Sequence, residues 1–274
     1  MTTILITGAS KGIGRATALH LDRKGFTVLA GVRNAADGDD LCKEASARLQ
    51  PILLDVTNPD QIAQVRELAG RQKVDGLVNN AGIAVAAPLE HLPIEEFRRQ
   101  IEVNLTGQLA VTQALIPALR HSKGRIINIS SIGGRIAGTM LGAYHASKFA
   151  LEALTDTLRQ ELAPWDIQVV SIEPGGIATP IWDTSLAVAN RLLAAMTEQG
   201  RQDYAQAIAG AQALAEHTTK SGLPPERVAE VIERALTARK PRTRYVVGMD
   251  AQIGTRILAN LPDRLRDRVL GMRR

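Results

Sequence analysis

Residues 125–148 read RIINISSIGGRIAGTMLGAYHASK, and this stretch decides how the rest of the chain is interpreted. Its first part, residues 126–129, is an apolar, β-branched run, which is typical of a strand buried on both faces. Ser131 follows at the carboxyl end of that strand. A glycine-rich connection then leads to a helix that we expect to begin near Tyr144, with Lys148 one turn further on.

The spacing of Tyr144 and Lys148 points to proton transfer. Residues four apart on a helix lie on the same face, so the phenol and the ammonium become neighbours. A free phenol has a pKa of about 10, and a nearby ammonium is expected to lower the pKa of Tyr144 toward neutrality. Ser131 would then hold the oxygen of a reacting alcohol or carbonyl while Tyr144 exchanges the proton. A Tyr and a Lys at this spacing are, taken alone, more often an ordinary surface contact. The surrounding motifs therefore decide whether this pair is interpreted as catalytic.

Apolar runs and helical patterns alternate from the first residues onward. Strands are predicted at ILIT, TVLAG, PILL, DGLVN, RIINIS and IQVVSI, and helices at residues 13–24, 39–49, 59–72, 93–121 and 144–163. Short apolar strands separated by helices predict an α/β fold, a doubly wound parallel sheet with helices on both faces. Ligands bind at the carboxyl ends of the strands in such a sheet.

A glycine-rich loop, TGASKGIG at residues 7–14, lies directly between the first strand and the first helix. Glycines allow a tight turn and let a pyrophosphate approach the backbone and the positive end of the helix. A purely structural strand-to-helix turn is the alternative, and the context favours a nucleotide site. The nucleotide contacts are predicted at Gly8, Ser10, Lys11, Gly12, Ile13 and Gly14.

The second strand indicates which nucleotide is bound. A site for NAD would place an acid at the end of this strand to bind the ribose hydroxyls. Here the strand ends Ala30-Gly31-Val32-Arg33 without an acid. Arg33 and Lys11 are suited to flank a ribose 2′-phosphate, although solvated surface charge is the alternative for both. We therefore predict NADP, with NAD less favoured.

Other polar residues follow the later strands. Asp55 ends the third strand and would either accept from an adenine amino group or cap the helix near Pro59. Residues 79–82 (NNAG) close the fourth strand, with a plain turn as the alternative. Asn104 interrupts a long helical pattern, where asparagine is mildly unfavourable, so a local bonding role is expected.

With these motifs assembled, the chain resembles the short-chain dehydrogenase/reductase family over residues 1–247. The match consists of TGASKGIG, NNAG, Asn104, Ser131 thirteen residues before Tyr144, YHASK and PGGIAT. The resemblance implies a single Rossmann-type domain of about seven strands and a catalytic tetrad of Asn104, Ser131, Tyr144 and Lys148, in which Lys148 also binds the nicotinamide ribose. It also implies cofactor contacts at Asp55, Val56, Asn80, Ala81, Gly82, Pro174, Gly175, Ile177 and Thr179. No metal is expected, because the hydride carrier and the tetrad perform the chemistry.

The segments GVRNAADG and RYVVGMDA resemble the retinol and hydroxysteroid dehydrogenase-like branch of the family. This resemblance implies an NADP(H)-dependent oxidoreductase that transfers hydride between nicotinamide and a carbonyl or secondary alcohol of a lipophilic, steroid-, retinoid- or fatty-type substrate. A nucleotide-binding redox sensor or scaffold on the same fold is the alternative. The intact Ser131, Tyr144 and Lys148 argue against it.

The composition is that of an ordinary soluble protein. The chain has 274 residues, of which 45% are hydrophobic and 22% charged, enough for a sizeable core. The single cysteine, Cys42, excludes an internal disulfide and suits a reducing compartment. We find no signal sequence and no apolar run long enough to cross a bilayer, and expect a cytoplasmic protein. Nucleic-acid binding is not indicated, because residues 1–238 are nearly neutral.

Two segments extend beyond the dinucleotide-binding pattern. Residues 181–221 begin with an apolar helical stretch beside the nicotinamide loop, which makes a substrate lid plausible. Residues 248–274 are predicted to form a basic helical tail, at the end of a C-terminal segment, residues 239–274, that holds ten of the 33 Lys and Arg residues. We favour packing of this tail on the body or on another subunit over contact with an anionic membrane. The helices at 93–121 and 144–163 are apolar on more than one face, which together with the resemblance predicts a homodimer or homotetramer.

Overall fold

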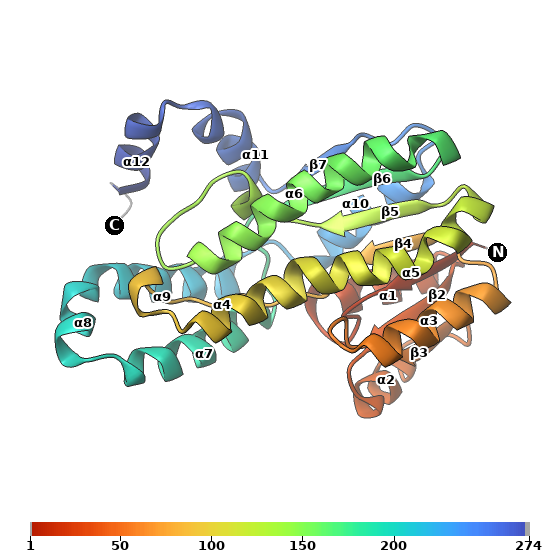
Figure 1. Ribbon diagram of the computed structural model, residues 1–274, viewed down its shortest axis with the longest axis horizontal. Helices are drawn as coiled ribbons and strands as arrows, with labels where there is room; N and C mark the ends of the chain where they lie inside the picture. The colour runs from red at the N-terminus through yellow and green to blue at the C-terminus, as the bar shows by residue number, and fades with distance from the viewer. Residues whose placement is uncertain (1, 272–274) are drawn as a thin grey trace.

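The protein, seen here as a computed structural model that describes residues 2–271, is built on one seven-stranded parallel sheet (Figure 1). The strands lie in the order β3-β2-β1-β4-β5-β6-β7. Their bounds are β1 Thr3–Ile6, β2 Thr27–Val32, β3 Leu49–Leu53, β4 Gly76–Asn79, β5 Arg125–Ile129, β6 Gln168–Pro174 and β7 Arg244–Val247. The order reverses between β1 and β4, and such a switch point is where open α/β sheets bind ligands.

Helices cover both faces of the sheet because successive strand residues point to opposite sides. Ile4 and Ile6 of β1 pack in a cluster with α1 (Gly12–Arg23), α2 (Ala35–Cys42) and α10 (Pro225–Thr237). Leu5 faces the other way, into a cluster with α3 (Pro59–Arg71), α5 (Gly107–Ser122) and α6 (Gly142–Leu162). The predicted fold is therefore confirmed in its layers and its strand count.

Two groups of helices extend beyond these layers. The segment 181–221 forms α7 (Ile181–Ala195), α8 (Glu198–Asp203) and α9 (Ala205–Ser221), which project from one end of the sheet (Figure 1). The basic tail forms α11 (Met249–Arg256) and α12 (Asp263–Gly271). Short 3₁₀ turns occur at η1 Leu89–His91, η3 Ile132–Gly134, η4 Ala163–Trp165 and η5 Leu258–Asn260.

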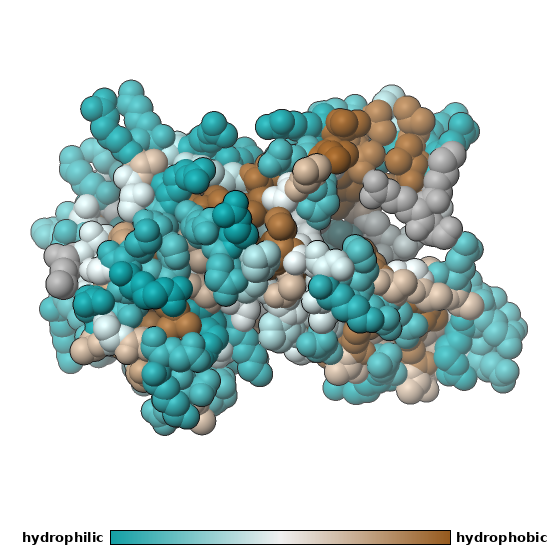
Figure 2. All heavy atoms as spheres, turned by 180° about the vertical axis from the view of Figure 1, so that it is seen from behind, coloured by the Kyte–Doolittle hydropathy of each residue, from teal (hydrophilic) through white to brown (hydrophobic). Residues whose placement is uncertain are grey.

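The tail divides into a packed part and an exposed part. Ala251 and Gly254 of α11 are buried, and Gly254 lies against Ile132 of η3. In contrast, α12 has no buried residue within its range. Apolar side chains gather on the surface around this segment (Figure 2), and the exposed ones are Met249, Ile253, Ile257 and Leu265. The last predicted tail residues, 272–274 with Arg273 and Arg274, lie outside the described residues.

One helix prediction was wrong in its bounds, and another missed an interruption within the helix. The helix expected at 39–49 is α2 at Ala35–Cys42, where the Asn34 side chain accepts from Asp37 N and fixes an earlier start. The helix expected at 93–121 consists of α4 (Ile94–Ile101), a π-helical turn η2 (Glu102–Thr106) and α5. Among residues 2–271, none of the helices combines the length and the apolarity that crossing a bilayer requires.

Candidate active site

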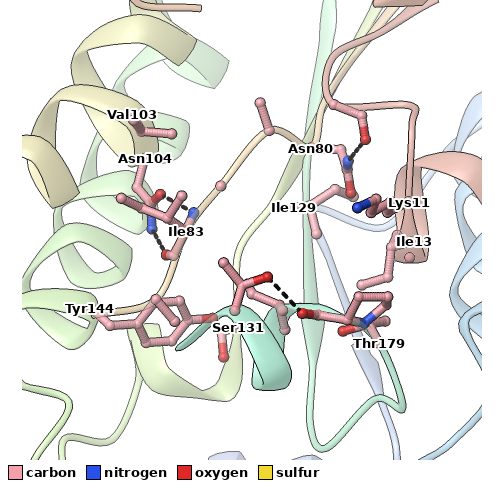
Figure 3. Close-up of a pocket in the computed structure, with 18 of the residues that line it drawn as sticks. Lys11, Ile13, Asn80, Ile83, Val103, Asn104, Ile129, Ser131, Tyr144 and Thr179 are labelled. Atoms are coloured by element: carbon pink, nitrogen blue, oxygen red, sulfur yellow. Dashed lines mark hydrogen bonds between the residues drawn. The ribbon is translucent and has the colours of Figure 1, made fainter. Parts of the chain in front are cut away.

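A cavity of about 550 Å³ opens at the carboxyl ends of the strands, where the strand order reverses between the paired strands β1 and β4. Its wall contains every predicted site residue except Gly14. The members are Gly8, Ser10, Lys11, Gly12, Ile13, Arg33, Asp55, Val56, Asn80, Ala81, Gly82, Asn104, Ser131, Tyr144, Lys148, Pro174, Gly175, Ile177 and Thr179. The structure thus brings together residues that lie between positions 8 and 179 of the chain, and Figure 3 shows several of them facing one another.

The glycine-rich loop has the shape that a phosphate requires. Gly8 and Gly12 have φ values of +65° and +53°, which side chains rarely tolerate. A Cβ on Gly14 would lie 2.2 Å from the Gly8 carbonyl oxygen, so Gly14 allows helix α1 to approach the loop instead of lining the cavity. The first N–H groups of α1 have no side-chain cap from Lys11, and such free donors favour an anion.

The segment 79–82 is more than a plain turn, because its side chains hold the phosphate loop. Asn80 Nδ2 donates to the carbonyl oxygens of Thr7 and Gly8 at 2.9 and 3.0 Å, and Figure 3 draws one of these two bonds. The Thr7 hydroxyl in return accepts from the backbone N–H groups of Asn80 and Ala81. Asn79 points the other way and donates to Thr112 and Asn128 in the buried interior.

The two alternatives for Asp55 are separated by the geometry. Asn58, not Asp55, caps helix α3, because its side chain accepts from the N–H groups of Asp60 and Gln61. Asp55 instead accepts from the N–H and the hydroxyl of Thr57 and lines the cavity. Arg33 and Lys11 are exposed at the cavity rim, and neither forms an ion pair within residues 2–271.

Asn104 lies in the π-helical turn η2 and is fully buried. Its amide is bonded to Ile83 twice, with Oδ1 accepting from Ile83 N at 2.9 Å and Nδ2 donating to Ile83 O at 3.0 Å (Figure 3). Nδ2 also donates to the Ser147 hydroxyl on α6. Single π-helical turns inside α-helices are frequent at functional sites.

Two buried glutamines, which the sequence analysis did not single out, act beside Asn104. Gln100 accepts from Val85 N and donates to Ile83 O, while Gln108 donates to Ala81 O. Together the three amides hold the strand-following segment 81–85 against the long helix. Their spacing of four residues along one predicted helix was a readable signal, since polar residues at that spacing share a face.

Ser131, Tyr144 and Lys148 come from β5's end and from α6. The Ser131 hydroxyl accepts from Gly133 N at 2.9 Å, which begins the η3 turn. Burial raises the pKa of Tyr144 above its usual range, and a hydrogen bond with the Ser131 side chain opposes that rise. Figure 3 shows the Tyr144 ring and Ser131 converging on the same part of the cavity.

The expectation that Lys148 lowers the pKa of Tyr144 is not met, because burial raises that pKa instead. Lys148 Nζ donates to the Ile129 carbonyl oxygen at 2.8 Å and lies 5.8 Å from the centre of the Tyr144 ring. The ammonium therefore faces the end of β5, and burial dominates at the phenol. Burial also lowers the pKa of Lys148 to about 8, while the charge of Glu152 opposes this shift.

A buried charge cluster lies behind Lys148. Glu152 accepts from the Ser171 hydroxyl and from Arg244, which also approaches Glu173 at 3.1 Å. Glu173 is 1% exposed, and burial followed by repulsion from Glu152 raises its pKa to about 7, against the opposing charges of Arg135 and Arg244. Sequence reasoning did not identify this cluster, because its members come from α6, β6, β7 and the turn after η3.

The remaining wall of the cavity is largely apolar. Ile83 and Ala84 line it on one side, and Ile181, Trp182, Thr184 and Val188 of α7 line it on the other. Two charged residues, Arg99 and Glu102, also belong to this wall. Val85, Ala87 and Leu192 form a small apolar cluster that joins the two sides. Polar contacts also join them, since Arg191 pairs with Glu96 and the Tyr204 hydroxyl donates to Glu90, each at 2.7 Å.

Comparison with known proteins gives one consistent result. The family model for short chain dehydrogenases matches residues 2–188. The chain is 40% identical to mouse retinol dehydrogenase 5, over 97% of this chain and 87% of that protein. It is 34% identical to the NADPH-dependent 3-dehydrocapnine reductase of Ornithobacterium rhinotracheale, over 98% and 96%. A short chain dehydrogenase from Burkholderia cenocepacia in complex with NADP superposes with a TM-score of 0.77 at 28% identity, over 98% and 97%.

Proposed function

This chain belongs to the short-chain dehydrogenase family, and we propose that it transfers hydride between NADP(H) and a carbonyl or secondary alcohol of a lipophilic substrate. One observation carries the proposal. A single cavity joins the glycine-rich loop, the two cationic residues Lys11 and Arg33, and the cluster of Ser131, Tyr144 and Lys148. When bound, NADP(H) supplies or accepts the hydride, and the protein's own residues must orient the substrate and move one proton.

Tyr144 is the proposed acid-base group. In the reducing direction its phenol donates a proton to the substrate oxygen, and in the oxidising direction the phenolate accepts one. Ser131 holds the same oxygen by a hydrogen bond, which is supported by its position beside the phenol. Lys148 binds the nicotinamide ribose, and its charge favours the phenolate. For this, Nζ would exchange its Ile129 contact for contacts nearer Tyr144.

Asn104 is proposed to hold a water molecule in the path along which the proton leaves. Its carbonyl and amide groups already bond Ile83 and Ser147, so its side chain is fixed before substrate arrives. The proposed lipophilic substrate is supported by the apolar residues Ile83, Ile181 and Val188 around the cavity. The related retinol and estradiol dehydrogenases also carry lipophilic substrates in their names. Segment 181–221 is proposed as the lid over this substrate, in a catalytic domain spanning 1–247.

The cofactor preference can be tested by reversing one charge. Arg33→Asp should lower the ratio of kcat/KM with NADPH to kcat/KM with NADH by about 10- to 100-fold, because charge-assisted hydrogen bonds contribute roughly 1.5–3 kcal/mol. Reduction of a panel of lipophilic ketones and aldehydes, followed by nicotinamide absorbance, measures the ratio. Arg23→Asp is the matched control, since Arg23 is exposed at the far end of α1. An unchanged ratio in Arg33→Asp would contradict the assigned 2′-phosphate contact.

A homodimer or homotetramer is proposed, built on α4, α5 and α6. This is supported by Ile94 and Phe149, which are 58% and 44% exposed on these helices. Phe149→Glu should reduce the mass measured by light scattering at micromolar concentration toward that of one chain, because a charge in an apolar interface is costly. Leu53→Glu, at an equally exposed leucine on β3, should leave the mass unchanged. A wild-type protein of single-chain mass would refute the proposal.

The proposed location is the cytoplasm, which is supported by the free, exposed thiol of Cys42. For the tail we propose packing on the protein itself, supported by the buried residues Ala251 and Gly254 of α11. The exposed apolar residues Ile253, Ile257 and Leu265 among arginines support the alternative, contact with an anionic membrane surface. The two tail helices therefore differ in burial, because α11 contains buried residues and α12 contains none.

A further inference from the structure

The loop Pro174–Thr179 follows β6 and carries four residues of the cavity wall, Pro174, Gly175, Ile177 and Thr179. At its centre stand two adjacent glycines, Gly175 and Gly176. Glycine loses more conformational freedom on ordering than any other residue, so this pair is the part of the wall that most needs external support. The structure shows support from two directions.

The segment that follows α9 supports the loop from one side. Leu223 N donates to Gly176 O at 3.0 Å, and Ala178 N donates to Leu223 O at 2.9 Å. The Trp182 indole N–H donates to Ile177 O at 2.9 Å from the start of α7. These contacts hold the carbonyl side of the loop and link it to the segment that covers the substrate part of the cavity.

The start of the C-terminal tail, together with the end of β7, supports the loop from the other side. Asp250, in the first turn of α11, accepts a hydrogen bond from Gly176 N at 2.7 Å through Oδ2. Gly175 N donates to Val247 O, the last residue of β7, at 2.9 Å. The N–H groups of both glycines therefore have acceptors here: the Val247 carbonyl of β7 for Gly175, and the Asp250 carboxylate of the tail, 74 residues away in sequence, for Gly176.

The backbone around Asp250 is shaped to admit its carboxylate. Gly248 has a φ of +106°, and a Cβ there would lie 2.4 Å from Asp250 Oδ1. A Cβ on Gly175 would lie 2.2 Å from Asp250 Oδ2. A side chain at either glycine would overlap the Asp250 carboxylate. Both the loop and the tail therefore leave room for the contact.

We propose that Asp250 is a positioning residue for the cofactor, which fixes the Gly175–Gly176 backbone of the nicotinamide-facing loop through its hydrogen bond to Gly176 N. The inference rests on the proposed NADP(H) site. A loop that is ordered before binding loses less conformational entropy when the cofactor binds, so the affinity for the cofactor is higher. The first helix of the tail would then belong functionally to the cofactor site, although it lies beyond the proposed catalytic domain.

The test compares Asp250→Ala, Asp250→Asn and the wild-type protein. Asp250→Ala should raise the dissociation constant for NADP⁺ about tenfold, because a lost hydrogen bond to a charged group is worth that much near a surface. Its kcat at saturating cofactor should stay within about twofold, since Asp250 touches none of the reacting groups. Asp250→Asn should retain most of the affinity, because the amide oxygen still accepts from Gly176 N.

Two controls separate the inference from a general loss of stability and from the proposed function. Asp263→Ala removes another acid of the same tail, one that pairs with Arg266, and should leave the affinity unchanged. Hydrogen exchange of the peptide that contains Gly176, measured without cofactor, should accelerate in Asp250→Ala and not in Asp263→Ala.

Each outcome has one meaning. Faster exchange at Gly176 with an unchanged dissociation constant would overturn the positioning role and leave the proposed function intact. Unchanged exchange would show that the contact does not order the loop, and the inference would fail. Absence of NADP⁺ binding by the wild-type protein would instead refute the cofactor site itself.

Discussion

Tyr144→Phe is expected to lose turnover by about 10²- to 10⁴-fold, the range that positioned acid-base groups contribute, while binding NADPH as tightly as the wild-type protein. The substitution removes one hydroxyl and keeps the ring that lines the cavity. The proton that the substrate oxygen needs would then have to come from water. Steady-state kinetics on an active carbonyl substrate give kcat, and fluorescence titration gives the affinity for NADPH.

Tyr245→Phe provides the matched control for this experiment. The Tyr245 hydroxyl accepts from Arg242 N beside β7, away from the cavity, so its loss should leave kcat unchanged. Near wild-type turnover in Tyr144→Phe would remove the basis for the whole proton path. A loss of NADPH binding in the same variant would point instead to a structural role of the hydroxyl.

Lys148→Met is expected to lower kcat about 10²- to 10³-fold, the cost of removing one donor that stabilises developing charge, and to weaken NADPH binding as well. Methionine fills the buried space of the lysine stem without leaving a charge there. One ammonium would serve both the ribose and the phenol, so rate and affinity should fall together. Lys123→Met, at an exposed lysine paired with Asp166, should change neither. An effect on kcat alone would separate the two roles.

The pH dependence of kcat/KM provides an independent test of whether activity requires the charged form of Lys148. Because burial lowers the pKa of Lys148 to about 8, the charged form is present below that pH and is lost above it. The wild-type kcat/KM should therefore decline on the alkaline side from about pH 8, and the residual activity of Lys148→Met should lack that decline. An alkaline decline that persists unchanged in Lys148→Met would assign it to another group.

Much of the fold and of the site was readable from local sequence. The strands are continuous apolar runs because both faces of the sheet are covered, and the glycine-rich loop stands where its function requires it. Even the missed start of α2 had a local signal, since Asn34 and Asp37 have the spacing of a helix cap. The fold and the family are confirmed by the comparisons. The NADPH-dependent relative and the neighbour in complex with NADP agree with the predicted cofactor, whereas the roles of individual residues stay predictions.

What the sequence could not provide is the set of contacts between distant segments. Lys148 was expected to face Tyr144, but its Nζ bonds Ile129, and this depends on where β5 ends relative to α6. Asp250 reaches Gly176 only because β7 aligns beside β6. Helical spacing specifies which face a residue occupies, and tertiary packing decides which atom it meets there.

Because of the π-helical turn at Glu102–Thr106, the number of residues in this part of the chain affects the geometry of the site. An α-helix advances about 100° per residue, so the extra residue in this wide turn sets the rotation between everything before it and everything after it. Gln100 lies ahead of the turn, Gln108 behind it, and Asn104 within it, yet all three amides reach the same segment, 81–85. A chain shortened by one residue between 101 and 107 would keep each of these side chains and still turn some of them away. We therefore expect an insertion or deletion here to disturb the site even when none of the three amides is replaced.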